Sequence, residues 1–374
     1  MKTRIGLIFG GRSGEHEISV RSAATVVEQI DKDKYSVVPI AIDQSGHWLG
    51  PRDSAKMLPE ASAALLKSDV EELPATNVAI IGDPARKGLT SLDGSDTERI
   101  DVGFPVLHGT FGEDGTIQGL FEMAGIPYVG CGVLASSCGM DKVTMKSLFL
   151  QAGLPICKYE WFLRSEWEKD PDAIISRVES AMRYPCFAKP ANLGSSVGIS
   201  KADTAQELRQ AISLAAEYDR RIIVEEGLKM REIECAILGN DDAQASQPGE
   251  YIIRNKDKAF LDYTEKYSGT GNNEFVVPAP VSEELSKKIR EYAVRAFKAI
   301  DGAGLARVDF FLRTDNGALL VNEINTMPGL TSASGYPKMW EGSGKQFSEV
   351  IDDLITLAIE RHADRERNKT SKTV

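Results

Sequence analysis

The fold of this chain is decided by the stretch Ala306-Arg-Val-Asp-Phe-Phe-Leu-Arg-Thr-Asp-Asn-Gly-Ala-Leu-Leu-Val-Asn-Glu-Ile-Asn-Thr-Met-Pro-Gly-Leu-Thr-Ser, residues 306–332. It holds two apolar runs, 306–312 and 318–324, on either side of the turn-forming sequence Thr314-Asp-Asn-Gly. Apolar runs joined by such a turn are typical of a β-hairpin. The stretch is therefore predicted to form two antiparallel strands.

Both predicted strands carry polar side chains at alternate positions. Alternate residues of a strand share a face, so Arg307 and Asp309 point the same way, and so do Glu323 and Asn325. Across the hairpin these faces can meet, which would place Asp309, Glu323 and Asn325 around one point. Oxygen ligands of this kind suit Mg²⁺ held together with substrate phosphates. A solvated outer face is the alternative, but the opposite face is also apolar, which favours interior strands and a nucleotide–metal site.

The composition is that of an ordinary globular protein. A length of 374 residues admits two or three domains. The net charge of −11, without any Lys/Arg block, argues against a nucleic-acid partner. No apolar run approaches a signal peptide or the roughly 20 residues of a membrane span, so we expect a cytoplasmic protein and no membrane partner. The cysteines lack CxxC spacing, which favours a reducing compartment over disulfides or structural zinc; they are Cys131, Cys138, Cys157, Cys186 and Cys235.

The N-terminal part predicts an α/β unit. Residues 5–9 form an apolar run that ends in Gly10-Gly11 and is followed by a helical pattern over 18–30. Strand, glycine turn and helix are the opening unit of a doubly wound sheet. Residues 44–99 have poor periodicity and are expected to form small helices and loops. The remaining predictions for this unit are strands at 35–42, 102–107 and from 128, and a helix at 115–124.

The rest of the chain predicts two further units, giving segments 1–141, 142–228 and 229–374. Residues 246–279 are irregular and too long for a simple connector. Thr204 is expected to cap a helix over 206–218. The other helices are predicted at 141–152, 172–184, 282–300 and 348–362, and the other strands at 186–189, 197–201, 221–226 and 233–238. The charged tail from 363 is expected to be frayed.

Two lysines and a glycine-rich turn indicate phosphate binding. Gly194-Ser195-Ser196-Val197-Gly198 connects two predicted strands, and its backbone N–H groups and hydroxyls can cradle phosphate oxygens. Such turns are common, but Lys189 lies in the apolar setting Cys-Phe-Ala-Lys-Pro, where a lysine needs an anionic partner. Lys142 begins a helix and is either a second phosphate contact or a surface lysine.

Four further residues each allow two interpretations, a role in ligand binding or a purely structural role. Glu15 begins a helix, where it either compensates the helix dipole or pairs with a small ammonium group in the crevice of the sheet. His108 follows a strand, and a structural histidine is at least as plausible there. Glu225 and Glu232 either recognise adenine and ribose at a hinge or belong to a charged loop.

Several motifs together resemble the D-alanine–D-alanine ligase family, in the expected order from the first strand to about Trp340. The N-terminal ones are Glu15-His-Glu-Ile-Ser and Leu107-His-Gly-Thr-Phe-Gly-Glu-Asp-Gly-Thr-Ile-Gln-Gly. The later ones are Gly194-Ser-Ser-Val-Gly, Glu265-Lys-Tyr, Ala306-Arg-Val-Asp and Asn322-Glu-Ile-Asn-Thr-Met-Pro-Gly-Leu-Thr. The resemblance implies a doubly wound α/β domain followed by an ATP-grasp fold with central and C-terminal subdomains.

The resemblance also implies the ligands and their residues. ATP would be the substrate, with two magnesium ions, or manganese in their place, held by Asp309, Glu323 and Asn325. Glu225 would lie by the adenine and Glu232 on the ribose. The full set of implied ATP contacts is Lys142, Lys189, Ser195, Ser196, Glu225, Glu232 and Lys266.

For the amino acids, the resemblance implies two subsites. Glu15 would orient the ammonium of the first D-alanine, with His108 near its carboxylate, and Ser334 would bind the carboxylate of the second. Arg307 and the backbone N–H of Gly329 would form an oxyanion hole. Ser195 and Tyr267 would complete a hydrogen-bonded set with Glu15 and close the segment 246–279 over the site as a lid.

The implied reaction begins with D-alanine and ATP, which form D-alanyl phosphate and ADP. A second D-alanine then displaces phosphate, and the dipeptide serves peptidoglycan precursor synthesis. The family also suggests a homodimer.

Departures and rivals remain open. Gly335 stands where the family usually carries Leu or Met, which would loosen the second-substrate pocket. Tyr267 favours D-alanine as the nucleophile over D-lactate, but D-serine is not excluded. A D-alanine–D-serine or D-alanine–D-lactate ligase is the closest rival. A carboxylate–amine ligase of purine synthesis and a non-catalytic nucleotide-binding protein are weaker ones.

Overall fold

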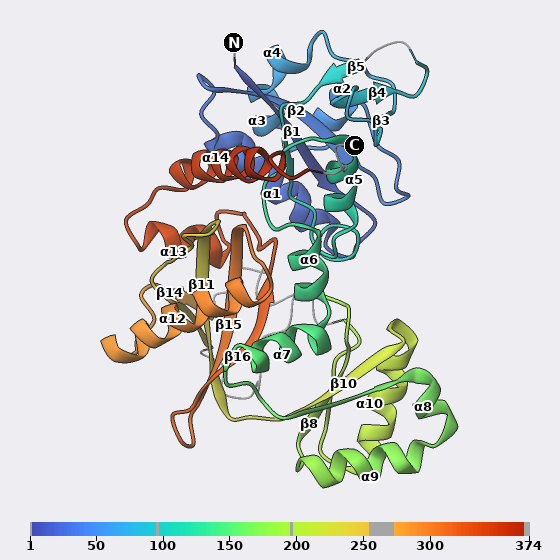
Figure 1. The fold of residues 1–374 in the computed structure, drawn as a ribbon, viewed down its shortest axis with the longest axis vertical. Coiled ribbons are helices and arrows are strands. Elements are labelled where there is room, and N and C mark those ends of the chain that lie inside the picture. Colours follow the sequence, from blue (N-terminus) through green and yellow to red (C-terminus); the bar gives the residue numbers. More distant parts are fainter. Residues whose placement is uncertain (1, 95–96, 195–196, 254–272, 370–374) are drawn as a thin grey trace.

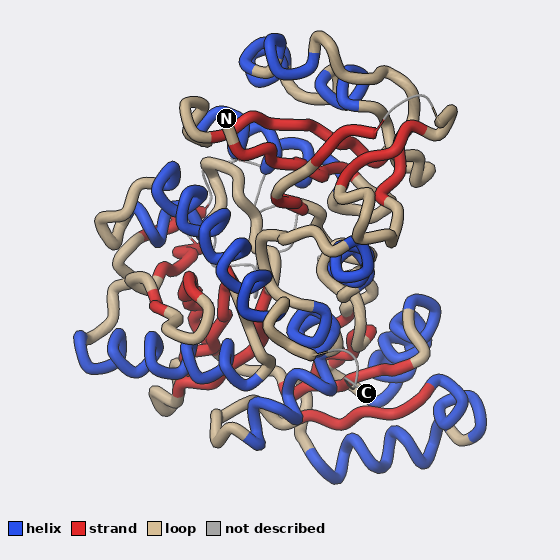
Figure 2. The backbone as a smooth tube through the Cα atoms, turned by 45° about the horizontal axis from the view of Figure 1, so that its top comes forward, coloured by secondary structure: helices blue, strands red, loops and turns tan. Residues whose placement is uncertain are grey.

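The computed structural model describes residues 2–94, 97–194, 197–253 and 273–369. Within these residues the strands form four sheets, which belong to three units that follow one another along the chain. Figure 1 shows the first unit above, the C-terminal sheet in the middle and the central unit below. Figure 2 shows the strands of each unit with helices packed around them.

The first unit is built on a parallel sheet of order β2-β1-β6, made of β1 (Thr3–Gly10), β2 (Tyr35–Ile42) and β6 (Val102–Pro105). The helices α1 (His16–Gln29) and α5 (Thr116–Ala124) flank it. These elements were predicted, although α1 begins two residues earlier. The strand predicted from Tyr128 is reduced to one parallel bridge with Gly103, because the chain turns away at once.

The segment 44–99 contains more structure than expected. Its helices are α2 (Pro51–Ala55), α3 (Glu60–Leu65) and α4 (Lys67–Val70), as the prediction of small helices required. An antiparallel sheet of β3 (Val78–Ile80), β4 (Gly88–Ser91) and β5 (Thr97–Arg99) follows. Strands of three or four residues show too little alternation to be recognised in the sequence.

Two helices lead from the first unit to the others. The helix α6 (Val133–Met140) was not predicted, and α7 (Lys142–Gln151) follows it at once. Asp141 caps α7 by accepting a hydrogen bond from the backbone N–H of Thr144 at 2.8 Å. Because Asp141 is extended in the backbone, it separates two helices that otherwise run on.

The central unit is an antiparallel sheet of order β7-β10-β8-β9. The strands are β7 (Tyr159–Leu163), β8 (Cys186–Pro190), β9 (Ser200–Ala202) and β10 (Arg221–Glu226). The helices are α8 (Arg164–Lys169), α9 (Pro171–Ala181) and α10 (Ala205–Tyr218). Thr204 caps α10 as predicted, whereas β7 and α8 were missed.

The C-terminal sheet contains the predicted hairpin of β15 (Gly304–Arg313) and β16 (Leu319–Asn325). Its other strands are β11 (Met230–Gly239), β12 (Gln244–Ala245), β13 (Gly249–Ile253) and β14 (Asn273–Val276). The expectation that 246–279 is irregular is therefore wrong at both ends, where β13 and β14 pair. Residues 254–272 of that segment lie outside the described part.

In the described part of the C-terminal unit, the helices are α12 (Glu283–Ala299), α13 (Gly335–Glu341) and α14 (Phe347–Arg365). The helices α12 and α14 were predicted, and α13 was not. The last helix, α14, packs back on the first unit, where Lys34 pairs with Asp352 at 2.8 Å. Helix α14 therefore joins the two ends of the chain.

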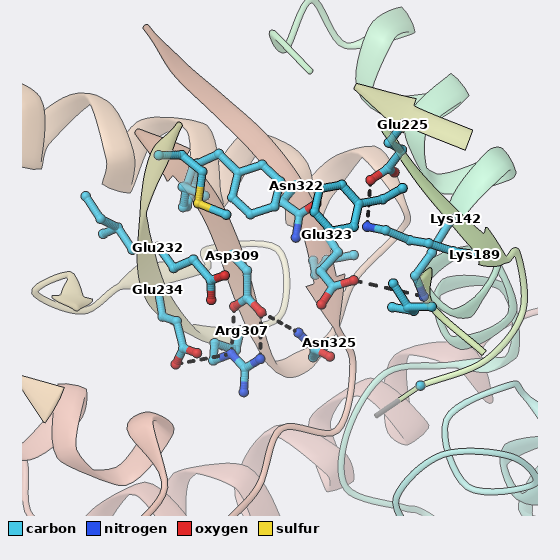
Figure 3. A pocket seen from close by; sticks show the side chains of 18 of the residues that line it. Lys142, Lys189, Glu225, Glu232, Glu234, Arg307, Asp309, Asn322, Glu323 and Asn325 are labelled. Atoms are coloured by element: carbon cyan, nitrogen blue, oxygen red, sulfur yellow. Dashed lines mark hydrogen bonds and ion pairs between the residues drawn. The ribbon is translucent and has the colours of Figure 1, made fainter. Parts of the chain in front are cut away.

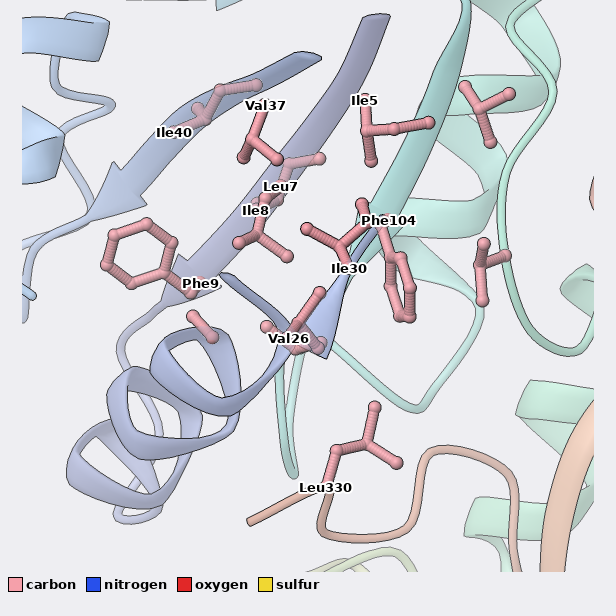
Figure 4. Packing of buried hydrophobic residues seen from close by; sticks show 14 of the residues in the cluster. Ile5, Leu7, Ile8, Phe9, Val26, Ile30, Val37, Ile40, Phe104 and Leu330 are labelled. Carbon is pink, nitrogen blue, oxygen red and sulfur yellow. The ribbon is translucent and has the colours of Figure 1, made fainter. Parts of the chain in front are cut away.

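The largest core cluster also crosses between units. Ile5, Leu7 and Phe104 form its centre in the first unit, and Leu330, from the loop after β16, lies against it (Figure 4). All four side chains are fully buried. The loop that follows the hairpin is thus fixed by the core of the N-terminal domain.

Gly103 in β6 packs directly on helix α5. A Cβ atom at this position would lie 2.5 Å from Cε1 of Phe121. We therefore expect Gly103→Ala to lower the free energy of unfolding by about 1–3 kcal/mol. In the matched control Gly119→Ala, within α5, the new methyl group meets nothing within 4 Å. That change should raise stability by about 0.5–1 kcal/mol in urea unfolding. Equal effects of the two changes would contradict this packing.

Candidate active site

A cavity of about 770 Å³ lies between the three units. This volume falls in the range typical of sites for small organic molecules. Its walls carry predicted site residues from each unit, among them Glu15 and His108 from the first and Lys142 and Lys189 from the centre. Figure 3 shows the side chains that the central unit and the C-terminal sheet contribute.

The hairpin brings its polar side chains together as predicted. In the register, Asp309 lies opposite Glu323 and Arg307 lies opposite Asn325. Arg307 donates to both oxygens of Asp309, from Nε and Nη2, at 2.6 Å each. The Nδ2 of Asn325 donates to Oδ2 of Asp309 at 3.1 Å. Arg307 thus forms a bidentate pair with a predicted metal ligand (Figure 3).

A β-bulge produces this arrangement. The pairing shifts between Asp309 and Phe310, so that Asn322 is the extra residue on β16. If the pairing of Phe310 with Val321 continued without the shift, Asp309 would lie opposite Asn322. Glu323 would then point to the other face of the sheet, away from Asp309. A bulge of this kind is not visible in the apolar pattern of the sequence.

The three predicted metal ligands offer two carboxylates and one amide oxygen. Among the described residues, no group of three or more His, Cys, Asp or Glu side chains is arranged to hold a metal ion. Two carboxylates with an amide oxygen are a small set, which fits Mg²⁺ when phosphate oxygens complete the coordination. The donor set is therefore compatible with a cation bound together with a nucleotide.

A buried ion cluster lies at the other side of the cavity. Glu225 accepts from Nζ of Lys189 at 2.6 Å and pairs with Nζ of Lys146 at 3.0 Å. Burial raises the pKa of Glu225, but the charges of Lys146 and Lys189 outweigh it and lower that pKa to about 2. The carboxylate predicted to lie by the adenine therefore holds two lysines.

Lys146 was missed in the sequence. Its side chain is 1% exposed, and Nζ also donates to the carbonyl of Asn322 at 3.2 Å. It lies four residues after Lys142 in α7, on the buried face of the helix. In the sequence, its buried position is indicated only by its place among the apolar residues of a predicted helix.

Lys142 is held near the hairpin. Its Nζ donates to the carbonyl of Leu193 at 2.8 Å and lies 4.0 Å from Oε2 of Glu323. Gly194, at the start of the predicted phosphate-binding turn, also lines the cavity. The structure thus brings Lys142, Gly194 and the predicted metal ligand Glu323 to one cavity.

Glu15 faces the same turn from the first unit. A Cβ atom on Gly109 would lie 2.7 Å from Oε2 of Glu15, and one on Gly194 would lie 3.5 Å from it. Gly109 also has a φ of +74°, which side-chain-bearing residues rarely adopt. The carboxylate of Glu15 therefore lies against the backbone of Gly109, where only glycine allows so close an approach, and within ordinary van der Waals distance of Gly194.

His108 is enclosed by protein groups. Its Nδ1 lies 3.0 Å from the carbonyl of Met327, and its Nε2 lies 3.1 Å from Oγ of Ser22. Burial lowers the pKa of His108, but the hydrogen bond and charge of Glu113 outweigh it, and the net shift is upward. Glu113 was missed, although it belongs to a quoted motif.

Ser334 stands at the N-terminal end of α13, 3% exposed, with its Oγ 2.7 Å from Oγ1 of Thr331. It is not among the residues that line the cavity, whereas Gly329 is. A Cβ atom on Gly335 would lie 2.5 Å from Oε2 of Glu234 and 2.9 Å from Cζ of Phe275. Gly335 thus makes room for Glu234. The expectation that this glycine loosens the second-substrate pocket stays a prediction.

The remaining predicted residues divide into two groups. Glu232 lies on β11 and lines the cavity. The others lie outside the described part of the chain: Ser195, Ser196, Lys266 and Tyr267.

Comparison with known proteins gives a consistent result over the whole chain. The family model "D-ala D-ala ligase N-terminus" matches residues 4–131, and "D-ala D-ala ligase C-terminus" matches residues 148–356. A D-alanine–D-alanine ligase of Natranaerobius thermophilus is 46% identical, covering 99% of this chain and 98% of its own. One from Ruminiclostridium cellulolyticum is 48% identical, covering 99% of both.

Solved structures agree with these matches. The D-alanine-D-alanine ligase of Coxiella burnetii has a TM-score of 0.82 at 36% identity and covers 98% of this chain and 96% of its own. The VanG D-Ala:D-Ser ligase of Enterococcus faecalis has a TM-score of 0.81 at 36% identity, covering 96% and 100%. These likenesses confirm the predicted α/β architecture with an ATP-grasp fold. In the described part of the chain, no helix has the length and apolar character needed to cross a membrane.

The buried cluster predicts how stability depends on pH. Glu225→Gln leaves two buried ammonium groups without their counter-charge, so we expect a loss of about 3–5 kcal/mol in the free energy of unfolding at pH 7. The pKa of Glu225 falls from its ordinary 4.5 to about 2 on folding. Its contribution is therefore complete above pH 4.5 and is lost as the pH falls towards 2.

Urea unfolding of both proteins from pH 7 to pH 3 measures this difference. The difference in free energy of unfolding between the unmodified protein and Glu225→Gln should stay constant down to about pH 5 and then shrink. Glu217→Gln, on an exposed position of α10, should change stability by no more than about 0.5 kcal/mol. A gap that persists undiminished at pH 3 would rule out the cluster as its source.

Proposed function

The chain belongs to the D-alanine–D-alanine ligase family, an enzyme family of ATP-dependent ligases, and from this we propose that it joins two D-alanines to D-alanyl-D-alanine. The reaction converts ATP to ADP and phosphate through D-alanyl phosphate. One observation carries the proposal: the cavity brings together Lys142 and Lys189, the Asp309–Glu323–Asn325 set and Glu15. Phosphate, cation and ammonium binding thereby share one space.

The first chemical step activates a carboxylate. A carboxylate oxygen of the first D-alanine attacks the γ-phosphorus of ATP, and ADP leaves. Lys142 and Lys189 neutralise phosphate oxygens as negative charge moves between them. Mg²⁺ held by Asp309, Glu323 and Asn325 supplies further positive charge at these oxygens when it is bound.

The second step forms the peptide bond. The deprotonated amine of the second D-alanine attacks the carbonyl carbon of D-alanyl phosphate, and phosphate leaves. Arg307 and the N–H of Gly329 donate to the oxyanion of the tetrahedral intermediate. Arg307 suits this role because its guanidinium already lies in the cavity wall, fixed by Asp309.

The amino acids are oriented by the first unit and by α13. Glu15 binds the ammonium of the first D-alanine, in the space bounded by Gly109 and Gly194. His108 lies near its carboxylate and contributes through its position and raised pKa, since both ring nitrogens contact protein atoms. Ser334, which does not line the cavity, is assigned to the carboxylate of the second D-alanine on the family resemblance alone.

The nucleoside part of ATP occupies the region between the central unit and β11. Glu232 binds the ribose hydroxyls. Glu225 lies by the adenine, and its two lysines fix it there. Ser195, Ser196 and Lys266 are proposed as further ATP contacts on the family resemblance alone, as are the homodimer, the cytoplasmic location and the role in peptidoglycan synthesis.

A D-alanine–D-serine ligase is the alternative, because one structural relative is described as a D-Ala:D-Ser ligase. Phosphate release with Mg·ATP separates the two, when D-alanine alone is compared with D-alanine plus D-serine or D-lactate and products are identified by mass. D-Alanyl-D-alanine from D-alanine alone supports the proposal. Phosphate release without dipeptide supports another second substrate, and no turnover with any D-amino acid overturns the substrate assignment.

Arg307→Ala tests the oxyanion hole. Loss of one such donor typically costs about 10²–10³-fold in kcat, and we expect this loss with ATP binding retained. Arg295→Ala, which removes an exposed partner of Glu291 on α12, should leave kcat unchanged. A kcat within about twofold of the unmodified enzyme would contradict the assigned role.

Tyr267→Phe tests the proposed lid. Acyl phosphates react with water, so a lid that excludes water should couple ATP use to dipeptide formation. We expect the variant to release more phosphate for each dipeptide formed. An unchanged ratio of phosphate to dipeptide would count against the lid.

A further inference from the structure

Glu234 is a buried acid in the cavity wall to which the reaction described above gives no role. It lies on β11 directly opposite Asp309 of β15, and its side chain is 3% exposed. Its Oε2 lies 3.3 Å from Nε of Arg307. Figure 3 shows Arg307 between Glu234 and Asp309, with both carboxylates directed at the guanidinium.

Arg307 therefore has two carboxylate partners of unequal strength. The bond to Asp309 is bidentate at 2.6 Å, and the contact between Nε of Arg307 and Oε2 of Glu234 is longer, at 3.3 Å. A cation bound to Asp309 competes with Arg307 for the same two oxygens. Because the guanidinium remains charged, releasing Asp309 without another carboxylate nearby would leave a buried charge uncompensated.

The structure holds Glu234 ready for this exchange. Gly335, the first residue of α13, leaves the space that the carboxylate fills, since a Cβ atom there would lie 2.5 Å from Oε2. The ring of Phe275 closes the same space, 2.9 Å from that Cβ position. Glu234 is thus confined beside Arg307.

We propose that Glu234 is a positioning residue that holds Arg307 when Asp309 binds a divalent cation. Arg307 then stays directed at the reacting carbonyl while Asp309 serves the cation. This inference rests on the proposed function, because it takes Asp309 as a cation ligand. It gives a role to Glu234, which is not one of the proposed metal ligands, through its 3.3 Å contact with Arg307.

The test measures binding of Mn²⁺ to the whole protein in the presence of ADP, with free Mn²⁺ followed by electron paramagnetic resonance. No turnover is needed. Glu234→Gln removes one anionic partner of Arg307, so Arg307 competes more strongly with the cation for Asp309. We expect the Kd for Mn²⁺ to rise about tenfold, and a tenfold change converts to about 1.4 kcal/mol. An unchanged Kd overturns the inference.

Glu250→Gln is the matched control. Glu250 is also a buried acid of this sheet, and it pairs bidentately with Arg231 at 2.7 and 2.6 Å, away from the cavity. Its loss should lower the melting temperature and leave the Kd for Mn²⁺ unchanged. A similar rise in Kd for Glu250→Gln would show a general effect of weakening the sheet and overturn the specific role.

Gly335→Ala provides a second variant that keeps the carboxylate but displaces it. The new methyl group should push Glu234 from Arg307 and weaken Mn²⁺ binding in the same direction. Combined with Glu234→Gln, it should add little, because both changes act on one contact. Full additivity overturns the inference. Absence of Mn²⁺ binding by the unmodified protein would instead overturn the proposed metal site itself.

Discussion

The site depends on the register of one antiparallel hairpin. The pairing of Asp309 with Glu323, together with the shift that follows it, puts an arginine, two carboxylates and an amide on one face of the C-terminal sheet. Side chains of a strand alternate between faces, so a slip of β16 by one residue would turn Glu323 and Asn325 to the opposite face, away from Asp309. The opposite face of the hairpin carries apolar side chains, including the fully buried Val308 and Val321. A slip would remove such side chains from the core, which makes it costly.

Charge on the cavity wall is arranged in compensated pairs before any ligand binds. Lys189 meets Glu225, and Arg307 meets Asp309. Buried charges of one sign would otherwise carry a large desolvation cost. The same pairing means that an anionic or cationic ligand must rearrange existing partners. The affinity for a charged ligand thus depends on the difference between the ion pairs that it forms and the ion pairs that it breaks.

Much of this could be predicted from the sequence, because strong patterns were decisive. The hairpin, the strand at 35–42 and the cap at Thr204 follow from periodicity and local chemistry. The sheet of β3–β5 was missed because its strands are too short to alternate visibly. Lys146 and Glu234 were missed for another reason: their importance comes from partners distant in the sequence, Glu225 and Arg307, and no local pattern records such contacts.

The return of α14 to the first unit has a consequence for synthesis of the chain. Leu354 and Ile355 belong to the same core cluster as Ile5 and Leu7, so the N-terminal domain lacks part of its apolar packing until translation is almost finished. The central unit has a core cluster of its own, formed by residues 162–224. During synthesis the middle of the chain can complete its packing first, although its beginning leaves the ribosome earlier. The order of folding is then set by where the partner residues lie along the chain.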